Sequence, residues 1–357
     1  MNSLVAPETK LPGVGTTIFT IMSQLARDYE AINLAQGFPD FPCSSELIDL
    51  VYKYMQAGCN QYAPMPGIMP LRERIAAKIQ SLYNFTYNPD TEVTLTCGAT
   101  ESSYAAITSV VKPGDEVIVF EPAFDCYTPA IHLSGGIPVY IELSYPDYKI
   151  DWNLVKEKIT PRTKLIIINS PHNPTGAIIT REDIEGLKEV VKDTSITILS
   201  DEVYEHIVFD GQQHESVIKY PELRERSLVI FSFGKTFHTT GWRMGYCVAP
   251  AALSAEFRKV HQFITFSVPT PMQFALADYL QDENHYTNLP RFFQEKRDKL
   301  SELLIHSRFE LIPSKGTYFQ LASYKNISDE NDVDFAIRLT KEYGVATIPV
   351  SVFYHTK

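Results

Sequence analysis

The sequence predicts an α/β fold, with a mostly parallel seven-stranded sheet covered by helices and a smaller α+β domain beside it. Short apolar, β-branched runs recur along the middle of the chain, and several are apolar on both faces, as strands of a covered parallel sheet are. Helix-length segments separate most of the runs, which is the alternation typical of α/β proteins. The runs span residues 93–96, 116–120, 138–141, 165–168, 196–199, 228–231 and 244–249.

The helices expected around this sheet follow from amphipathic spacing and from cap residues. Ser44 and Ser45 precede an apolar-periodic stretch and are typical of a helix start. The last two strand runs have no full helix between them, so we expect them to be antiparallel neighbours. Proline-rich, irregular links are expected at 36–42 and 60–67. The expected helices span 18–29, 46–56, 71–83, 101–111, 125–133, 151–159 and 181–192.

The C-terminal part has a different organisation. A long polar helix is expected over 285–306, with Pro290 near its start or a bend. A hairpin around Lys315 and Gly316, a helix over 333–343 and a strand over 345–350 complete a small α+β unit. The predicted domains are an N-terminal arm that also contributes to the small domain (1–43), a large domain (44–279) and a small, incomplete C-terminal domain (280–357).

Composition bounds the function. The 357 residues carry 43 acidic and 32 basic side chains, a net charge of −11, which argues against a nucleic-acid partner and for small-molecule chemistry. The five cysteines are widely spaced, with no C-x-x-C and no ligand-spaced histidines, so we expect reduced thiols and no metal site. We find neither a signal-peptide core nor an apolar run of about 20 residues. A cytoplasmic protein with no membrane partner is expected.

The chemistry is expected around Lys235, which comes just after a buried strand run. α/β enzymes bind ligands at this rim of the sheet. Ser232 and Arg243 offer a hydroxyl and a guanidinium suited to a phosphate, so an amine between them suggests the Schiff-base lysine of a pyridoxal phosphate enzyme. A P-loop is excluded because its first glycine would fall at Val229. The S-x-x-K of serine β-lactamases also fits Ser232 to Lys235, but its companion motifs are missing.

Other strand ends offer groups that would serve the same cofactor. Ala99 and Thr100 open a helix whose free N–H groups could hold an anion, although such a turn is more often a simple cap. Asp201 ends a strand, and its side chain is either a helix cap or the carboxylate that keeps a pyridine nitrogen protonated. Asn173 lies in an Asn-Pro turn, where its amide either shapes the turn or binds a phenolic oxygen. Phe124 either packs or stacks on a flat ring.

Together these fragments resemble the class I aminotransferases of fold type I, and most of all the branch that contains the methionine and kynurenine/glutamine aminotransferases. The resemblance runs from about Asn33 to the end of the chain. Its motifs occur in the order of the family: L-A-Q-G-F-P-D-F-P, Q-Y-A-P-M-P-G, G-A-T-E, P-H-N-P-T-G, S-D-E-V-Y and S-F-G-K…G-W-R-M-G. Each motif is weak alone, but six in the same order leave little room for chance.

The resemblance implies pyridoxal 5′-phosphate as the cofactor and three catalytic residues. Lys235 would form the Schiff base and carry the proton, Asp201 would pair with the pyridinium, and Tyr204 would bind the phenolic oxygen. The other residues implied to hold the cofactor are Asn173 at the phenolic oxygen, Phe124 on the ring, and Ala99, Thr100, Ser232 and Arg243 at the phosphate, with Tyr62 reaching the phosphate of a neighbouring subunit in a homodimer.

The resemblance also implies a substrate site. Gly37 would lie near the substrate carboxylate together with Asn173, and we expect Phe19 and Phe266 in the side-chain pocket. The family clamps that carboxylate with an arginine beyond the strand expected at 345–350, and we expect the native polypeptide to continue past Lys357 with that arginine and a helix. The expected reaction moves the amino group of a large uncharged amino acid (methionine, aromatic or kynurenine-like) to a 2-oxo acid. A cystathionine-type C–S β-lyase and a non-catalytic, cofactor-binding regulator are the alternatives.

Overall fold

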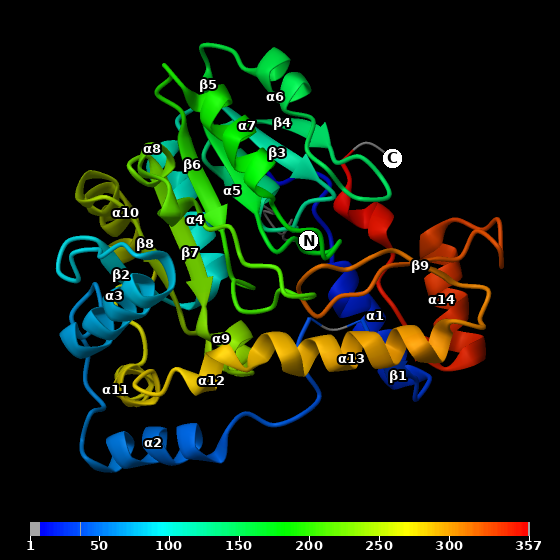
Figure 1. Cartoon of the computed structure of the whole chain (residues 1–357), viewed down its shortest axis with the longest axis horizontal. Helices are drawn as coiled ribbons and strands as arrows, with labels where there is room; N and C mark the ends of the chain where they lie inside the picture. Colours follow the sequence, from blue (N-terminus) through cyan, green and yellow to red (C-terminus); the bar gives the residue numbers. More distant parts are fainter. Residues whose placement is uncertain (1–7, 36, 356–357) are drawn as a thin grey trace, which may run out of the picture.

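The computed structural model describes residues 8–35 and 37–355, and its centre is a seven-stranded sheet (Figure 1). The strand order is β2-β8-β7-β6-β5-β3-β4, and all neighbours are parallel except β8, which runs antiparallel to both β2 and β7. The predicted sheet and its antiparallel final pair are therefore confirmed. The strands are β2 (Val93–Thr96), β3 (Glu116–Glu121), β4 (Ile137–Glu142), β5 (Thr163–Asn169), β6 (Thr197–Asp201), β7 (Ser227–Ser232) and β8 (Gly245–Val248).

Helices cover both faces of the sheet, because successive side chains of each strand point to opposite sides. Ile166 and Ile168 pack into one core, whereas Leu165 and Ile167 pack into the other. The first core is completed by α2 (Ser45–Gln56), α3 (Met69–Tyr83), α6 (Trp152–Lys158), α7 (Arg181–Val191) and α11 (Thr270–Tyr279). The second is completed by α4 (Gly98–Val110), α5 (Tyr127–Leu133) and α10 (Ala251–Ile264).

The parallel strands end at one rim of the sheet, where the polar last residues of β5 and β6 lie side by side. β5 ends in Asn169 and β6 ends in Asp201, and the two are paired in register. The next strand, β7, leads directly into the short helix α9 (Phe233–Thr236), which contains Lys235. Three neighbouring strands thus place an amide, a carboxylate and an amine on the same rim.

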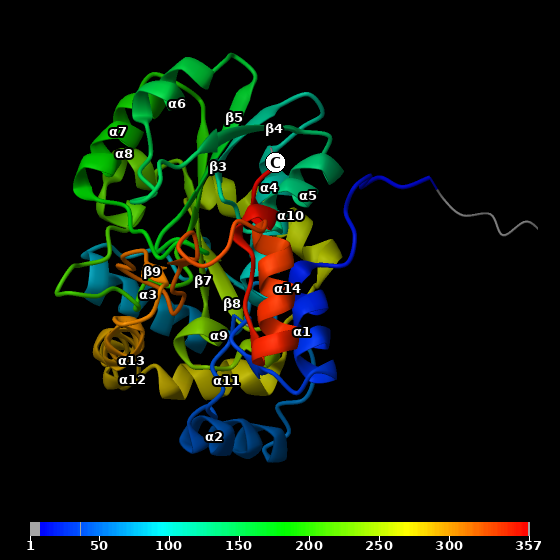
Figure 2. The same cartoon turned by 90° about the vertical axis from the view of Figure 1, so that its right-hand side faces the viewer.

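A second group of elements joins the two ends of the chain. The helix α13 leads from below the sheet toward α14 (Figure 1), and α1 lies beside α14 (Figure 2). β1 pairs in parallel with β11, and a small core that includes Met22, Ala26 and Ala336 lies between these elements. The elements are α1 (Ile18–Asp28), β1 (Ile32–Asn33), α12 (Asn284–Thr287), α13 (Leu289–Leu304), β9 (Glu310–Leu311), β10 (Ala322–Ser323), α14 (Asp332–Tyr343) and β11 (Val345–Ala346).

Several C-terminal expectations need correction. The helix expected over 285–306 is two helices, α12 and α13, with Pro290 in the first turn of α13, where its missing N–H costs nothing. The strand expected over 345–350 stops at Ala346, because its partner β1 ends at Asn33, and a 3₁₀ turn follows at Val350–Phe353. β9 and β10 form the expected pair, but Lys315 and Gly316 lie in a long connection that bridges to Val208, beyond the end of β6.

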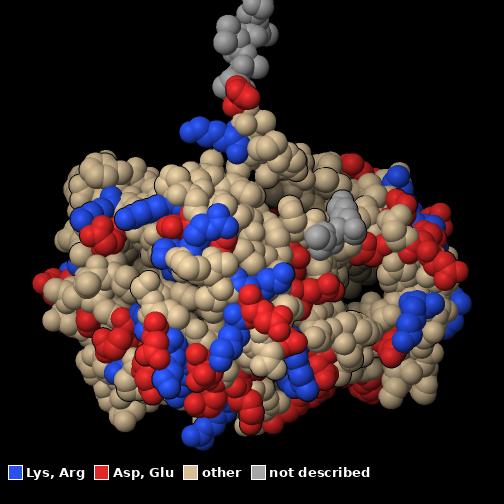
Figure 3. Space-filling view, turned by 90° about the horizontal axis from the view of Figure 1, so that it is seen from above, with Lys and Arg blue, Asp and Glu red and all other residues tan. Residues whose placement is uncertain are grey.

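The expectations missed α10, α11 and the single-turn helix α8 (Pro221–Arg224). Within residues 8–35 and 37–355, no helix has the length and apolarity needed to cross a membrane. On the face shown in Figure 3, basic and acidic side chains are interspersed over the surface.

Candidate active site

Lys235 lies where three distant segments of the chain meet. Its Nζ donates hydrogen bonds to the carbonyl oxygen of Gly37 at 2.9 Å and to the hydroxyl oxygen of Tyr318 at 3.0 Å. A Cβ built on Gly37 would stand 3.6 Å from the Phe319 ring and 3.9 Å from the lysine Nζ. The amine is therefore held in a half-buried position between the N-terminal segment and the 312–321 connection.

Asn169 links two of the predicted site residues. Its side-chain amide donates to the carbonyl oxygen of Asp201 at 2.9 Å, and its Oδ1 accepts from the backbone N–H of Asn173 at 2.8 Å. The register of β5 against β6 makes both contacts possible. Asn169 thus fixes the turn that carries Asn173 relative to the strand that carries Asp201.

Asp201 is a buried carboxylate with two hydrogen-bond donors. Its Oδ2 accepts from the Tyr127 hydroxyl at 2.6 Å, and its Oδ1 accepts from the backbone N–H of Val203 at 3.3 Å. Burial raises the pKa of Asp201 to about 6, although Tyr127, the Val203 N–H and the charge of Lys235 all oppose the shift. A cation placed against this carboxylate would restore its ordinary ionisation, so the site suits a protonated ring nitrogen.

Tyr204 is buried one turn after Asp201, with its ring edge-on to Tyr318 at 5.2 Å. Burial and the neighbouring Tyr318 hold the pKa of Tyr204 well above its ordinary value, so its phenol stays a hydrogen donor. The next residue, Glu205, points to the opposite side and forms a buried ion pair with Lys78 on α3. The buried ion pair between Glu205 and Lys78 therefore fixes the turn that contains Tyr204 against α3.

The start of α4 brings together groups that could bind an anion. Its first backbone N–H groups have no helical acceptor, and the positive end of the helix dipole lies there. Arg243 has a left-handed backbone (φ 55°), and its guanidinium lies over Gly98: a Cβ there would be 2.6 Å from Nη2. Nη2 is also 3.5 Å from the Thr100 hydroxyl. Ala99 follows Gly98 in the first turn, and Ser232 ends the adjacent β7. These groups suit a phosphate.

The remaining predicted residues lie farther out or stand exposed. Phe124 follows β3, and its ring is edge-on to that of Tyr127, with 5.9 Å between the ring centroids. Phe19 on α1 contacts Phe353 at 5.8 Å, at the rim of the small unit. The rings of Tyr62 and Phe266 pack edge to face, with 5.5 Å between their centroids, and Tyr62 is 84% exposed.

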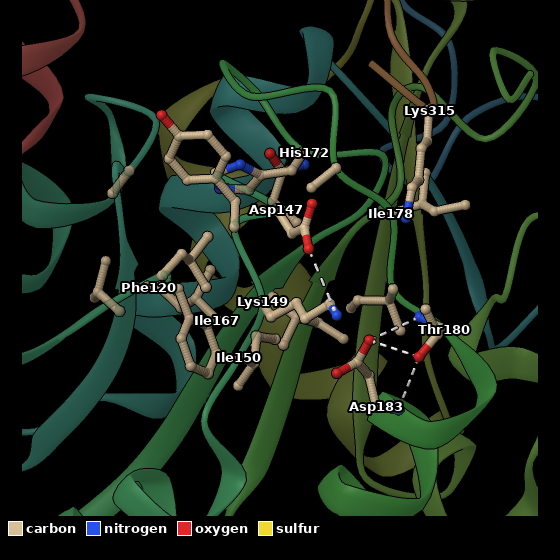
Figure 4. A pocket seen from close by; sticks show the side chains of 18 of the residues that line it. Phe120, Asp147, Lys149, Ile150, Ile167, His172, Ile178, Thr180, Asp183 and Lys315 are labelled. Atoms are coloured by element: carbon tan, nitrogen blue, oxygen red, sulfur yellow. Dashed lines mark hydrogen bonds and ion pairs between the residues drawn. The ribbon is translucent and has the colours of Figure 1, made fainter. Parts of the chain in front are cut away.

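A cavity of about 400 Å³ lies beside this rim (Figure 4). Among the described residues, its walls include Tyr127 and Asn169 but neither Lys235 nor Asp201. The cavity therefore shares Tyr127 and Asn169 with the surroundings of Asp201 but does not enclose the Lys235 amine. Its apolar wall includes Phe120, Ile150, Ile167 and Ile178, and Lys149 and Lys315 stand at its edge.

Four residues of this site escaped the sequence analysis: Tyr127, Asn169, Tyr318 and Phe319. Asn169 had a usable signal, because a polar residue that ends an apolar strand lies on the same rim as Asp201. Tyr127 looks like an ordinary helix residue in sequence. Tyr318 and Phe319 come from the separate 312–321 connection, which backbone hydrogen bonds to Gly176 and Ile207 hold at the site.

Comparison with known proteins adds relatives along the whole chain. The family model described as aminotransferase class I and II matches residues 29–357. Methionine aminotransferase of Escherichia coli is 50% identical over 353 residues, covering 99% of this chain and 92% of its own length. Kynurenine–oxoglutarate transaminase of Dictyostelium discoideum is 35% identical, with 99% and 90% covered. The crystal structure of E. coli YbdL, for which a methionine aminotransferase function was identified, superposes with a TM-score of 0.97 at 50% identity and covers 99% of this chain and 93% of its own.

Proposed function

The chain belongs to the family of class I and II aminotransferases, and from that premise we propose that it transfers the amino group of a large uncharged amino acid, methionine foremost, to a 2-oxo acid. The observation that carries the proposal is the Lys235 amine, held 2.9 Å from Gly37 on the same strand-end rim as the buried Asp201 carboxylate. This arrangement offers a nucleophilic nitrogen, a proton carrier and a buried anion within one site.

Enzymes of this family depend on pyridoxal 5′-phosphate, and the residues present fit it. When bound, the cofactor supplies an aldehyde carbon that bonds nitrogen and a cationic ring that accepts the electrons released at the substrate Cα. Asp201 would hold the ring nitrogen protonated, and Tyr204 and Asn173 would donate to the phenolic oxygen. Phe124 would lie on the ring. Ala99, Thr100, Ser232 and Arg243 would bind the phosphate.

Other residues of this chain would transfer the proton, position the substrate and exclude water. Lys235 Nζ would take the proton from the substrate Cα and deliver it to the carbon that was the cofactor aldehyde. Gly37 would lie near the substrate carboxylate, as its contacts with Lys235 and Phe319 suggest. Burial of Asp201 and Tyr204 keeps water from competing with the ligand for these groups.

The substrate class rests on the aromatic character of the site. The rings of Tyr204, Tyr318 and Phe319 pack on one another, with 5.0 to 5.9 Å between ring centroids. The Phe293 ring packs on Tyr318, with 5.6 Å between their centroids. Apolar and aromatic walls favour a large uncharged side chain over a carboxylate. The E. coli relative that is named for methionine supports the same choice.

A homodimer is part of the proposal. Tyr62 is 84% exposed and packs on Phe266, so these two aromatic rings share one surface, and Phe263, which precedes Phe266 in the chain, is 85% exposed. We propose that this surface meets a second copy and that Tyr62 contributes to the phosphate site of the partner. A monomer in sedimentation measurements of the holoprotein would contradict this assembly. A cytoplasmic location is supported by five cysteines without disulfide bonds, and cell fractionation tests it.

The function is tested with purified holoprotein and a panel of amino donors. Methionine, phenylalanine and kynurenine should each give the matching 2-oxo acid when a 2-oxo acid acceptor is present, and glutamate and aspartate should be poor donors. Lys235→Ala should lower transamination by several orders of magnitude, because both its covalent and its proton-transfer roles are lost. Near-normal turnover of that variant would refute the assignment. Pyruvate and a thiol released from cystathionine would instead identify a β-lyase.

A further inference from the structure

Tyr318 touches the reactive nitrogen of Lys235, and neither the family motifs nor the sequence pattern singled it out. Its hydroxyl oxygen lies 3.0 Å from Lys235 Nζ and also contacts the carbonyl oxygen of Gly37. The carbonyl has no hydrogen to give, so the tyrosine O–H points at Gly37 and the tyrosine lone pairs face the lysine. The amine thus has two acceptors, Gly37 and Tyr318, which are themselves linked.

The Tyr318 ring is held in place independently of its hydroxyl. It packs edge-on against Tyr204 at 5.2 Å and contacts Phe319 and Phe293 at 5.0 and 5.6 Å. These contacts fix the direction of the C–O bond toward Lys235. A phenylalanine at this position keeps all three ring contacts and loses only the oxygen.

The backbone before Tyr318 is strained in a way that aims the side chain. Thr317 is fully buried and has φ +66°, a left-handed conformation that a β-branched residue rarely adopts. Its N–H donates to Ile207 at 2.9 Å, and Gly316 donates to Gly176 at 3.0 Å. Such outliers persist only when the surroundings force them, and they gather at functional sites.

We propose that Tyr318 is a catalytic residue of this aminotransferase: its hydroxyl holds the free ε-amine of Lys235 against Gly37 in the position from which it bonds the cofactor and moves the substrate proton. A free lysine side chain has many rotamers, and two fixed acceptors select one of them. In the bonding step the neutral lysine nitrogen would replace the oxygen on the aldehyde carbon, and that oxygen would leave as water with the two hydrogens of the amine. This role rests on the proposed function.

The test compares two ligands that differ only at the reacting carbon. Pyridoxal phosphate can bond Lys235, whereas 4-deoxypyridoxine 5′-phosphate, with a methyl group in place of the aldehyde, cannot. In the apoprotein, Tyr318→Phe should slow covalent capture of pyridoxal phosphate about fivefold, the value of one hydrogen bond. Its affinity for 4-deoxypyridoxine 5′-phosphate should stay within about twofold of wild type. In turnover, kcat should fall by a similar factor and KM should change little.

Tyr324→Phe is the matched control. Tyr324 belongs to the same part of the chain, its hydroxyl donates to Glu330 at 2.8 Å, and its ring stacks on Phe335 at 4.1 Å. It should change neither capture nor affinity. The proposal is overturned if Tyr318→Phe captures pyridoxal phosphate at the wild-type rate, or if both ligands weaken equally, which would show a general distortion. Capture needs no turnover, so a wild-type protein that captures the cofactor but makes no 2-oxo acid would refute the proposed function alone.

Discussion

The phenol of Tyr127 donates a 2.6 Å hydrogen bond to Oδ2 of Asp201, and both residues are buried. Tyr127 belongs to α5 and Asp201 to the end of β6, so the bond joins a helix of one layer to the rim of the sheet. A charged acceptor makes such a bond worth about 1.5 to 3 kcal/mol. The bond orients Asp201, and because it favours the ionised carboxylate it opposes the larger effect of burial, which raises the pKa of Asp201.

Tyr127→Phe should therefore weaken the role of Asp201 without removing the group itself. The variant keeps the ring contact with Phe124 and loses one donor, so the pKa of Asp201 should rise further. We expect kcat to fall about tenfold and the acidic limb of the pH–rate profile to move to higher pH. An unchanged profile with a lower melting temperature would show that Tyr127 serves packing alone.

Asp201→Asn should stabilise the apoprotein at neutral pH while it weakens the cofactor site. Burial raises the pKa of Asp201 from 3.8 to about 6, so between these values the folded protein holds a proton that the unfolded chain has lost. The stability contributed by this residue is thus present below pH 4 and lost as pH rises through 6. Above that interval the asparagine variant should be more stable by about 2 to 3 kcal/mol.

Urea unfolding of the apoprotein at pH 5 and pH 7.5 measures this difference. The advantage of Asp201→Asn should grow by about 1 kcal/mol between the two pH values. Asp147 is exposed, so the stability difference between Asp147→Asn and wild type should be the same at both pH values. A variant that is less stable than wild type at pH 7.5 would contradict a net cost of burying the Asp201 carboxylate.

Gly98→Ala should damage the proposed phosphate site through two effects. Gly98 has φ +75°, and the added Cβ would meet the Arg243 guanidinium at 2.6 Å. Displacing that guanidinium should lower cofactor affinity about tenfold or more. Gly114→Ala is the control that separates backbone strain from the clash with Arg243. Gly114 also has a positive φ (+86°), but an added Cβ would meet nothing there. Gly114→Ala should cost about 1 kcal/mol of unfolding free energy and leave cofactor affinity unchanged. Equal affinities for both variants would remove Arg243 from the phosphate site.

Lys78→Met should destabilise the whole protein by about 3 to 5 kcal/mol, because it leaves Glu205 buried without its main partner. Burial alone would raise the pKa of Glu205, but Lys78 and His206 hold it well below its ordinary value. Thermal unfolding measures the loss. Lys156→Met breaks an exposed pair with Glu189 and should cost less than about 0.5 kcal/mol. Similar costs for the two variants would mean that the buried pair is solvated.

The site was partly predictable because its residues follow strands. Asp201, Asn173 and Ser232 lie at or just after the ends of adjacent strands, and parallel strands bring their ends to one rim wherever the sheet forms. The predicted seven-stranded sheet is confirmed for the same reason: β-branched runs at regular spacing are a local signal. The helices α10 and α11 escaped because they do not lie between two strand runs.

By itself, the sequence determined the order of strands and helices, the position of Lys235 after β7 and the motifs that identify the family, because each of these depends on residues close together in the chain. Only the tertiary structure decided what meets Lys235 and Asp201. Tyr318 reaches the lysine from 83 residues away and Tyr127 reaches the aspartate from 74. Both contacts depend on how layers pack and on a strained turn at Thr317, and neither leaves a periodic pattern in the chain.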